Sequence, residues 1–233
     1  MPGVRARRPR AVLFDLDCTL TDRAATVAAF AERFADRFGN EMRPTGDGLS
    51  PVEATVAATI TAADADGYAP RRRVFARLRR DLQWKRKGDV ESLKRFWHDV
   101  FPACARPAAG LRETLLGLRE RGVKIGVVSN GGADTQLRKI DALGIRSLLS
   151  SIVVSGAVGV RKPDRRIFDL ALDGVGARPD ECWMVGDHPA LDMAGARAAG
   201  LRRVWLRGVH PWPTPAPPPD EQIDRLPDVL TLI

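Results

Sequence analysis

The segment Ala11-Val12-Leu13-Phe14-Asp15-Leu16-Asp17-Cys18-Thr19-Leu20 is an apolar run that ends in two aspartates placed two residues apart. Side chains two apart in an extended chain point the same way, so Asp15 and Asp17 are expected to converge past the carboxyl end of a buried strand. Two carboxylates held together away from water need a cation or a proton between them. Magnesium fits, because it binds carboxylates and keeps positions for water and phosphate oxygens. A solvated strand-end turn remains the alternative for this segment alone.

Three further segments place polar groups directly after predicted strands. Ser129 and Asn130 follow the β-branched run 123–128, and Lys162 lies in a loop after the strand 152–154. The apolar run 182–185 leads into Gly186, then into Asp187 and Asp192. The carboxyl ends of parallel strands share one sheet edge, where ligands bind in open α/β folds. These groups are therefore expected to meet there.

Each residue type in this set suits phosphoryl transfer. One carboxylate of the first pair can attack phosphorus, and the other can move protons to and from the reacting oxygens. Ser129 and the backbone N–H groups of the turn 130–132 can hold phosphate oxygens at a helix start. Lys162 supplies a point charge for the phosphate or the nucleophile. Asp187 would complete a magnesium site.

The four motifs, in this order, resemble those of the haloacid dehalogenase superfamily of phosphatases. The matching segments are 14–20, 128–130, 162–163 and 185–192. The resemblance implies a Rossmann-like core with a helical cap inserted after the first strand (the type of subfamily I). It also implies that Asp15 is the nucleophile and Asp17 the acid/base. Magnesium would be bound by the side chains of Asp15 and Asp187 and by the backbone carbonyl of Asp17.

The resemblance assigns supporting roles to the remaining motif residues. Phosphate binding is implied for Thr19, Ser129, Asn130 and Lys162, and support of the cation or of Lys162 for Asp192. Dehalogenases of this family lack the second aspartate of the first motif, so Asp17 favours phosphate chemistry. Cys18 stands where glycine is commonest, and we expect a small buried side chain there. His188 follows Asp187 directly, and we interpret it as a turn residue or a group that reaches the substrate.

Helix-like and strand-like periods alternate from Leu111 onward, which predicts an α/β fold with a parallel sheet and helices on both faces. The stretch before it breaks this rhythm, because its apolar residues recur only at helical spacing. Helices are expected at 24–38, 52–63, 74–82 and 90–100, and a further one at 190–199. Eighty residues of helix are too many for a loop. We predict a helical cap at 22–104 and a core formed by 1–21 and 105–233.

The composition limits the partners and the compartment. The formal net charge is +8, and much of the excess lies in Arg5, Arg7, Arg8 and Arg10 and in the stretch 71–87. Such runs are usually solvated faces, so no specific nucleic-acid partner is expected. Three widely spaced cysteines and the lack of any apolar run of about twenty residues predict a cytoplasmic protein without membrane contact. The oligomeric state is left open.

Together these features predict a Mg²⁺-dependent phosphatase for a small phosphorylated metabolite, acting through an aspartyl-phosphate. The substrate classes considered are sugar phosphates, phosphoglycolate and nucleoside monophosphates. A sugar phosphomutase of the same family uses the same motifs and is an open alternative. A non-enzymatic, phosphate-responsive regulator is the alternative from another class, although such receivers carry no helical insert of this size.

Overall fold

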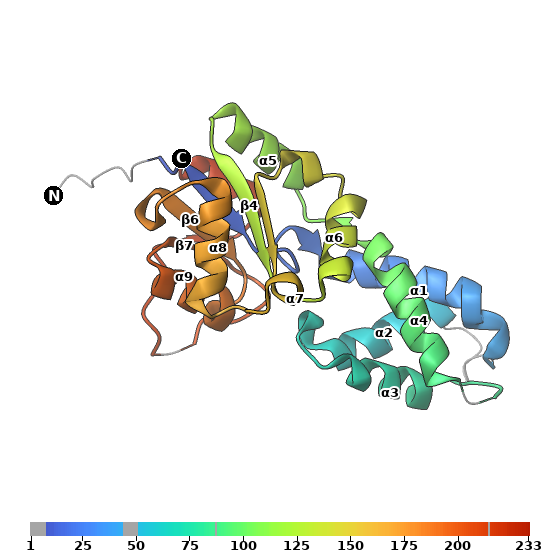
Figure 1. Cartoon of the computed structure of the whole chain (residues 1–233). Coiled ribbons are helices and arrows are strands. Elements are labelled where there is room, and N and C mark those ends of the chain that lie inside the picture. Colours follow the sequence, from blue (N-terminus) through green and yellow to red (C-terminus); the bar gives the residue numbers. More distant parts are fainter. Residues whose placement is uncertain (1–7, 44–50, 87, 214) are drawn as a thin grey trace. The chain divides into compact units, whose positions relative to one another are not determined.

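A computed structural model describes residues 8–43, 51–86, 88–213 and 215–233. Arg5, Arg7 and Lys87 of the predicted basic runs lie outside the described residues. The chain forms two compact units, one of residues 1–21 and 107–233 and one of residues 22–106 (Figure 1). It passes between them through β2 (Thr21–Asp22) and β3 (Arg106–Pro107), which pair as a two-stranded sheet. None of the helices in the described ranges has the length and hydropathy needed to cross a bilayer.

The first unit is built on a six-stranded parallel sheet, which confirms the predicted α/β fold. Its strands, in the order in which they pair, are β5 (Ser151–Val154), β4 (Lys124–Ser129), β1 (Ala11–Phe14), β6 (Cys182–Gly186), β7 (Arg202–Leu206) and β8 (Glu221–Ile223). In this register Phe14, the last residue of β1, lies between Val127 and Val185. The central strands therefore end level with one another at a single edge.

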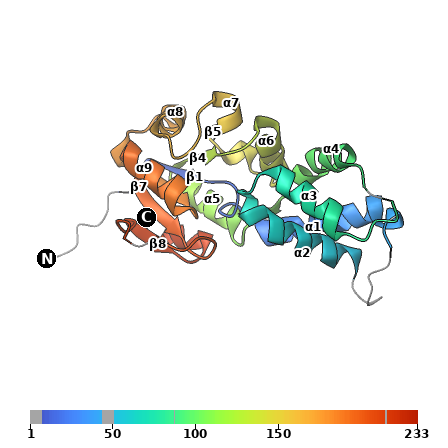
Figure 2. The ribbon, with the colours of Figure 1, turned by 90° about the horizontal axis from the view of Figure 1, so that it is seen from below.

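Helices cover both faces of this sheet (Figure 2). Val12 and Phe14 pack on one face with α5 (Leu111–Glu120), whereas Ala11 and Leu13 pack on the other with α8 (Arg165–Val175) and α9 (Ala194–Ala199). This unit also contains α6 (Ala133–Ala142) and α7 (Ser155–Val158). Because both faces of β1 are buried, its sequence is continuously apolar rather than alternating.

The second unit consists of helices around an aromatic core. They are α1 (Arg23–Phe38), α2 (Val52–Asp64), α3 (Arg71–Asp81) and α4 (Val90–Val100), close to the predicted ranges except that α3 begins three residues earlier. Trp97 of α4 stacks on Phe101 with a centroid distance of 4.1 Å, and Phe30 of α1 packs against both rings. Asp22 caps α1 by accepting a hydrogen bond from the N–H of Ala25 at 2.9 Å.

The expected helix at 190–199 is interrupted. Residues Pro189–Met193 form a π-helical turn, and only the residues of α9 are α-helical. The N–H of Met193 donates to the carbonyl of His188 five residues earlier, and Nδ1 of His188 accepts from the N–H groups of Ala190 and Leu191. π-Turns are often found at functional sites, and this one carries Asp192.

Candidate active site

The polar groups that end or follow the central strands lie at one edge of the sheet. Asp15 comes directly after β1, Ser129 is the last residue of β4, and Asp187 comes directly after β6. The N–H of Asp15 donates to the carbonyl of Val185 at 2.9 Å, which continues the pairing of β1 with β6 by one residue. This bond fixes the backbone from which the Asp15 carboxylate projects.

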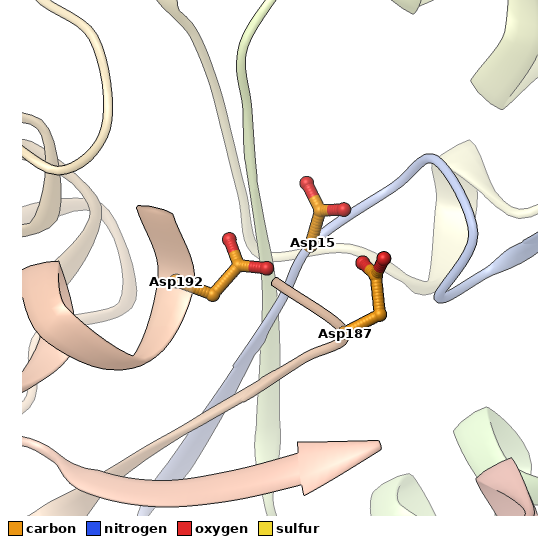
Figure 3. Close-up of side chains that lie close together, drawn as sticks. All are labelled: Asp15, Asp187 and Asp192. Carbon is orange, nitrogen blue, oxygen red and sulfur yellow. The ribbon is translucent and has the colours of Figure 1, made fainter. Parts of the chain in front are cut away.

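Three buried carboxylates converge at this edge (Figure 3). Asp15, Asp187 and Asp192 each offer an oxygen atom, and these atoms all lie within 4.8 Å of one another. Asp192 fits because Gly186 has no side chain: a Cβ atom at 186 would lie 2.5–2.7 Å from atoms of the Asp192 side chain. The cluster therefore depends on a glycine at the end of β6.

Lys162 binds two of these carboxylates. Its Nζ contacts Oδ1 of Asp15 and lies 2.6 Å from Oδ1 of Asp192, and all three side chains are buried. Asn130 holds the backbone of this lysine, because its Nδ2 donates to the Lys162 carbonyl at 3.0 Å and its Oδ1 accepts from the Lys162 N–H at 2.9 Å. The structure thus places the Asn130 side chain on Lys162, where it fixes the position of the ammonium group.

Burial changes the protonation of this cluster. It raises the pKa of Asp187 to about 9 and that of Asp15 to about 7, and the neighbouring carboxylates add to the shift of each. Burial opposes the charged form of Lys162, but the carboxylates of Asp15 and Asp192 raise its pKa above the usual value. Lys162 therefore stays protonated, while the carboxyl groups require additional positive charge to ionise together.

The donor set fits a hard divalent cation. Within the described residues, Oδ2 of Asp15 and Oδ2 of Asp187 are buried and accept no hydrogen bond, although such oxygens are costly to leave without a partner. The carboxylates of this region belong to Asp15, Asp17, Asp187 and Asp192, and the ammonium groups belong to Lys139 and Lys162. When all of these groups are ionised, two negative charges are left over. Carboxylate oxygens are the ligands that magnesium prefers.

Thr19 and the turn after β4 have hydrogen-bond partners within the protein. The Thr19 hydroxyl, predicted to bind phosphate, donates to Oδ1 of Asp187 at 3.1 Å. In the turn, the N–H of Gly131 donates to Oγ of Ser155 at 3.0 Å.

Cys18 is a small buried residue with φ of 62°, a left-handed conformation that suits the glycine common at this position. Its backbone, rather than its thiol, shapes the turn after β1.

Asp17 does not join the three-carboxylate cluster. The strand ends at Phe14, so the extended spacing from which convergence was expected does not continue to Asp17. Both of its carboxylate oxygens accept hydrogen bonds from Lys139, and Gln136 donates to one of them. Sequence reasoning missed Gln136 and Lys139, although their place on the helix directly after Ser129 is a usable signal.

Two histidines lie beside the cluster. Nδ1 of His188 caps the π-helical turn, as expected for a turn residue, and burial together with the nearby His210 lowers its pKa. The His210 ring lies 4.4 Å from the His188 ring, and its Nε2 is 3.5 Å from Oδ2 of Asp187. His210 lies outside the four motifs, so its proximity to Asp187 was not predicted.

Comparison with known proteins matches most of the chain. A family model described as haloacid dehalogenase-like hydrolase matches residues 9–200. A glyceraldehyde 3-phosphate phosphatase of Methanothermobacter thermautotrophicus is 32% identical over 197 residues, which cover 84% of each protein. Among solved structures, a hydrolase of the same superfamily from Geobacter sulfurreducens covers 99% of this chain and 98% of its own, with a TM-score of 0.68 and 22% identity.

Other relatives match over shorter lengths. A phosphoserine phosphatase of Thermus thermophilus is 41% identical over 113 residues, which are 48% of this chain and 45% of that protein. The chain thus spans less than half of that relative.

Proposed function

Because the chain belongs to the haloacid dehalogenase-like hydrolase family, we propose that it is a magnesium-dependent phosphatase for a small phosphorylated metabolite. The membership confirms the resemblance drawn from the four motifs. The observation that carries the proposal is the convergence of Asp15, Asp187 and Asp192 at the carboxyl edge of the sheet, with Lys162 bound to two of them.

In the proposed reaction, the Asp15 carboxylate attacks the phosphorus of a monoester and the bond to the leaving oxygen breaks. Asp17 gives that oxygen a proton, and takes one from the water that later hydrolyses the aspartyl-phosphate. Lys162 binds Oδ1 of Asp15 and so orients the carboxylate for the attack. Magnesium, when bound by Asp15 and Asp187, would reduce the repulsion between these carboxylates and an anionic substrate.

Ser129 is the side chain best placed to hold the phosphate. Its Oγ accepts a hydrogen bond from Nε2 of Gln136 at 2.6 Å, so its own hydroxyl hydrogen points elsewhere and can be donated to a phosphate oxygen. For Thr19 and Asn130, the bonds within the protein favour a supporting role. We propose that Thr19 orients Asp187 and that Asn130 orients Lys162.

The test is release of inorganic phosphate with magnesium present. The substrate panel should contain an aryl phosphate, sugar phosphates, phosphoglycolate and nucleoside monophosphates, together with phosphoserine and glyceraldehyde 3-phosphate because relatives are named for them. Conversion of a sugar phosphate to its isomer without phosphate release would instead identify a phosphomutase. A chelator should abolish turnover, and restored magnesium should recover it.

The matched variants are Asp15→Asn and Asp169→Asn. Asp169 lies on α8 and pairs with Arg165 on the exposed side of that helix, so its replacement changes the same functional group outside the site. We expect turnover to be lost in the first variant and retained in the second. Full activity of Asp15→Asn would rule out the proposed nucleophile.

A further inference from the structure

We propose that Gln136 and Lys139 form an Asp17 clamp, a pair of positioning residues on α6 that holds the acid/base carboxylate and links it to Ser129. The proposal rests on the phosphatase function proposed above and adds two residues to it. It places part of the catalytic apparatus on a helix that none of the four motifs includes.

The clamp contacts both oxygens of Asp17. Nζ of Lys139 lies 2.7 Å from Oδ1 and 2.8 Å from Oδ2, and Nε2 of Gln136 lies 2.9 Å from Oδ2. Gln136 and Lys139 are three residues apart, so they project from the same face of the helix. Their partner is more than one hundred residues earlier in the chain, and these bonds tie α6 to the turn after β1.

Burial distinguishes the clamp from an ordinary surface ion pair. The Lys139 side chain is 3% exposed, whereas that of Asp17 is 21% exposed. Taking an ammonium group out of water is costly unless its partner is well placed. Lys139 is therefore enclosed while the carboxylate stays partly accessible, as required of a group that exchanges protons with a substrate.

Gln136 connects this carboxylate to the phosphate-binding side of the site. Its amide nitrogen has two hydrogens, and its two shortest bonds go to Oδ2 of Asp17 and to Oγ of Ser129. One amide thereby fixes the acid/base and the direction of the Ser129 hydroxyl. As the bond to the leaving oxygen breaks, the proton of the Asp17 carboxyl goes to that oxygen. The carboxylate that forms is stabilised by Lys139 until water returns a proton.

The readout is the dependence of kcat/KM on the leaving group. p-Nitrophenolate leaves without a proton, whereas an alkoxide needs one, and kcat/KM reports on the transfer to Asp15 without the later hydrolysis step. We expect Lys139→Met to lower kcat/KM for an alkyl phosphate by about 10²–10³-fold and for p-nitrophenyl phosphate by less than about 10-fold. Lys139→Arg should recover part of the loss, because it keeps a buried donor.

Four further variants complete the design. Asp17→Asn should show the same leaving-group pattern, and the double variant Asp17→Asn/Lys139→Met should be no worse than Asp17→Asn, because the clamp acts through Asp17. Gln136→Met should show a weaker form of the pattern, and it serves as the test if Lys139→Met does not fold. Lys124→Met is the matched control, since Nζ of Lys124 binds the carbonyl of Val175 at the opposite end of β4.

The outcomes separate the two proposals. Equal losses on both substrates, or losses that multiply in the double variant, would overturn the clamp while the phosphatase function stands. A wild-type protein that releases no phosphate from any member of the panel would overturn the function and the clamp with it.

Discussion

The two units each contain a buried ion cluster, and the clusters differ in the balance of charge. In the sheet unit, Lys162 lies between Asp15 and Asp192, with Asp187 beside them. In the helical unit, the single carboxylate of Asp64 lies between two arginines. In the first cluster three carboxylates lie around one ammonium group, whereas in the second one carboxylate binds two guanidinium groups.

Aromatic rings lie against both arginines of the helical cluster. Arg23 binds Oδ2 of Asp64 and lies 5.0 Å from the centre of the Phe101 ring, and Arg71 binds Oδ1 and lies 5.2 Å from that of Trp97. Each guanidinium is thus attracted by a carboxylate and by a π-face. Both oxygens of Asp64 are occupied, which fits a cluster that joins α1, α2 and α3.

The sheet cluster leaves oxygens of its own carboxylates without a hydrogen bond from the described part of the chain. Buried oxygens of Asp15 and Asp187 accept no hydrogen bond from the described residues, and burial has raised the pKa of both groups. Strongly shifted carboxyl groups around a shared space are typical of reaction sites. We therefore interpret the carboxylates around Lys162 as the site, and Asp64 with its two arginines as a support of the helical unit.

Asp15→Asn tests the distinction most sharply. Loss of the nucleophile should lower turnover by at least about 10⁴-fold. The fold should be as stable as the wild type or more so at about pH 8, because a neutral amide replaces a carboxyl whose pKa burial has raised to about 7. Phosphate release and thermal unfolding without a cation measure the two effects. Strong destabilisation of the fold in Asp15→Asn would show that this cluster, too, mainly stabilises the fold.

Asp64→Asn should strongly lower the stability of the fold, in contrast to Asp15→Asn. Its replacement leaves two guanidinium groups without their carboxylate, and breaking a buried pair in this way costs about 3–5 kcal/mol of unfolding free energy. Glu91→Gln is the control, since Glu91 is exposed on α4 and pairs with Lys94. The control should change stability by less than about 0.5 kcal/mol. Chemical denaturation of both variants checks the prediction, and equal stabilities would refute it.

The stabilising effect of a divalent cation should increase with pH. Burial raises the pKa of Asp187 from 3.8 to about 9 and that of Asp15 from 3.8 to about 7. The protons held on these two carboxyl groups stabilise the fold fully below the unfolded pKa of 3.8. This stabilisation is lost as pH rises through the folded pKa values of about 7 and about 9. A cation displaces the protons, so magnesium should raise Tm by about 5–10 °C more at about pH 8.5 than at about pH 5.5. A pH-independent increase would argue against binding at these carboxylates.

Gly186→Ala should destabilise the fold less than Asp64→Asn does. The added Cβ would overlap the Asp192 side chain, and overpacking of this kind costs about 1–3 kcal/mol. The control is Gly39→Ala, because Gly39 has open space around it and helical φ. Gly144 also has open space, but its positive φ makes it unsuitable as a control. Gly39→Ala should therefore leave thermal unfolding nearly unchanged, and a similar shift in both variants would contradict the role of Gly186.

The sheet and the motif segments could be predicted because local pattern and chemistry agree there. An apolar run followed by a polar group describes both a buried parallel strand and its ligand-binding end, so Asp15, Ser129 and Asp187 were found at one edge. The helices of the second unit could be predicted because apolar residues recur with helical spacing. In these segments the neighbouring residues in the sequence are sufficient to predict whether a residue lies in a strand, at the end of a strand or in a helix.

The missed residues depend on contacts between distant segments. Gln136 and Lys139 look like solvated positions of an amphipathic helix, whereas in the folded chain both are buried and bind Asp17 in the turn after β1. Asp64 and Arg23 are forty-one residues apart, and no local pattern predicts their pairing. The π-helical turn is capped by the His188 side chain, and the helical spacing of apolar residues does not predict such a cap.

The space above Gly186 also has an evolutionary consequence. Asp192 occupies the volume that any larger residue at 186 would need, and it is held there by Lys162 and by the N–H of His188. A lineage can change Gly186 without harm only after it has replaced Asp192. We therefore expect the two positions to vary together among relatives, so that glycine at 186 accompanies aspartate at 192 and is free to drift once that aspartate is gone.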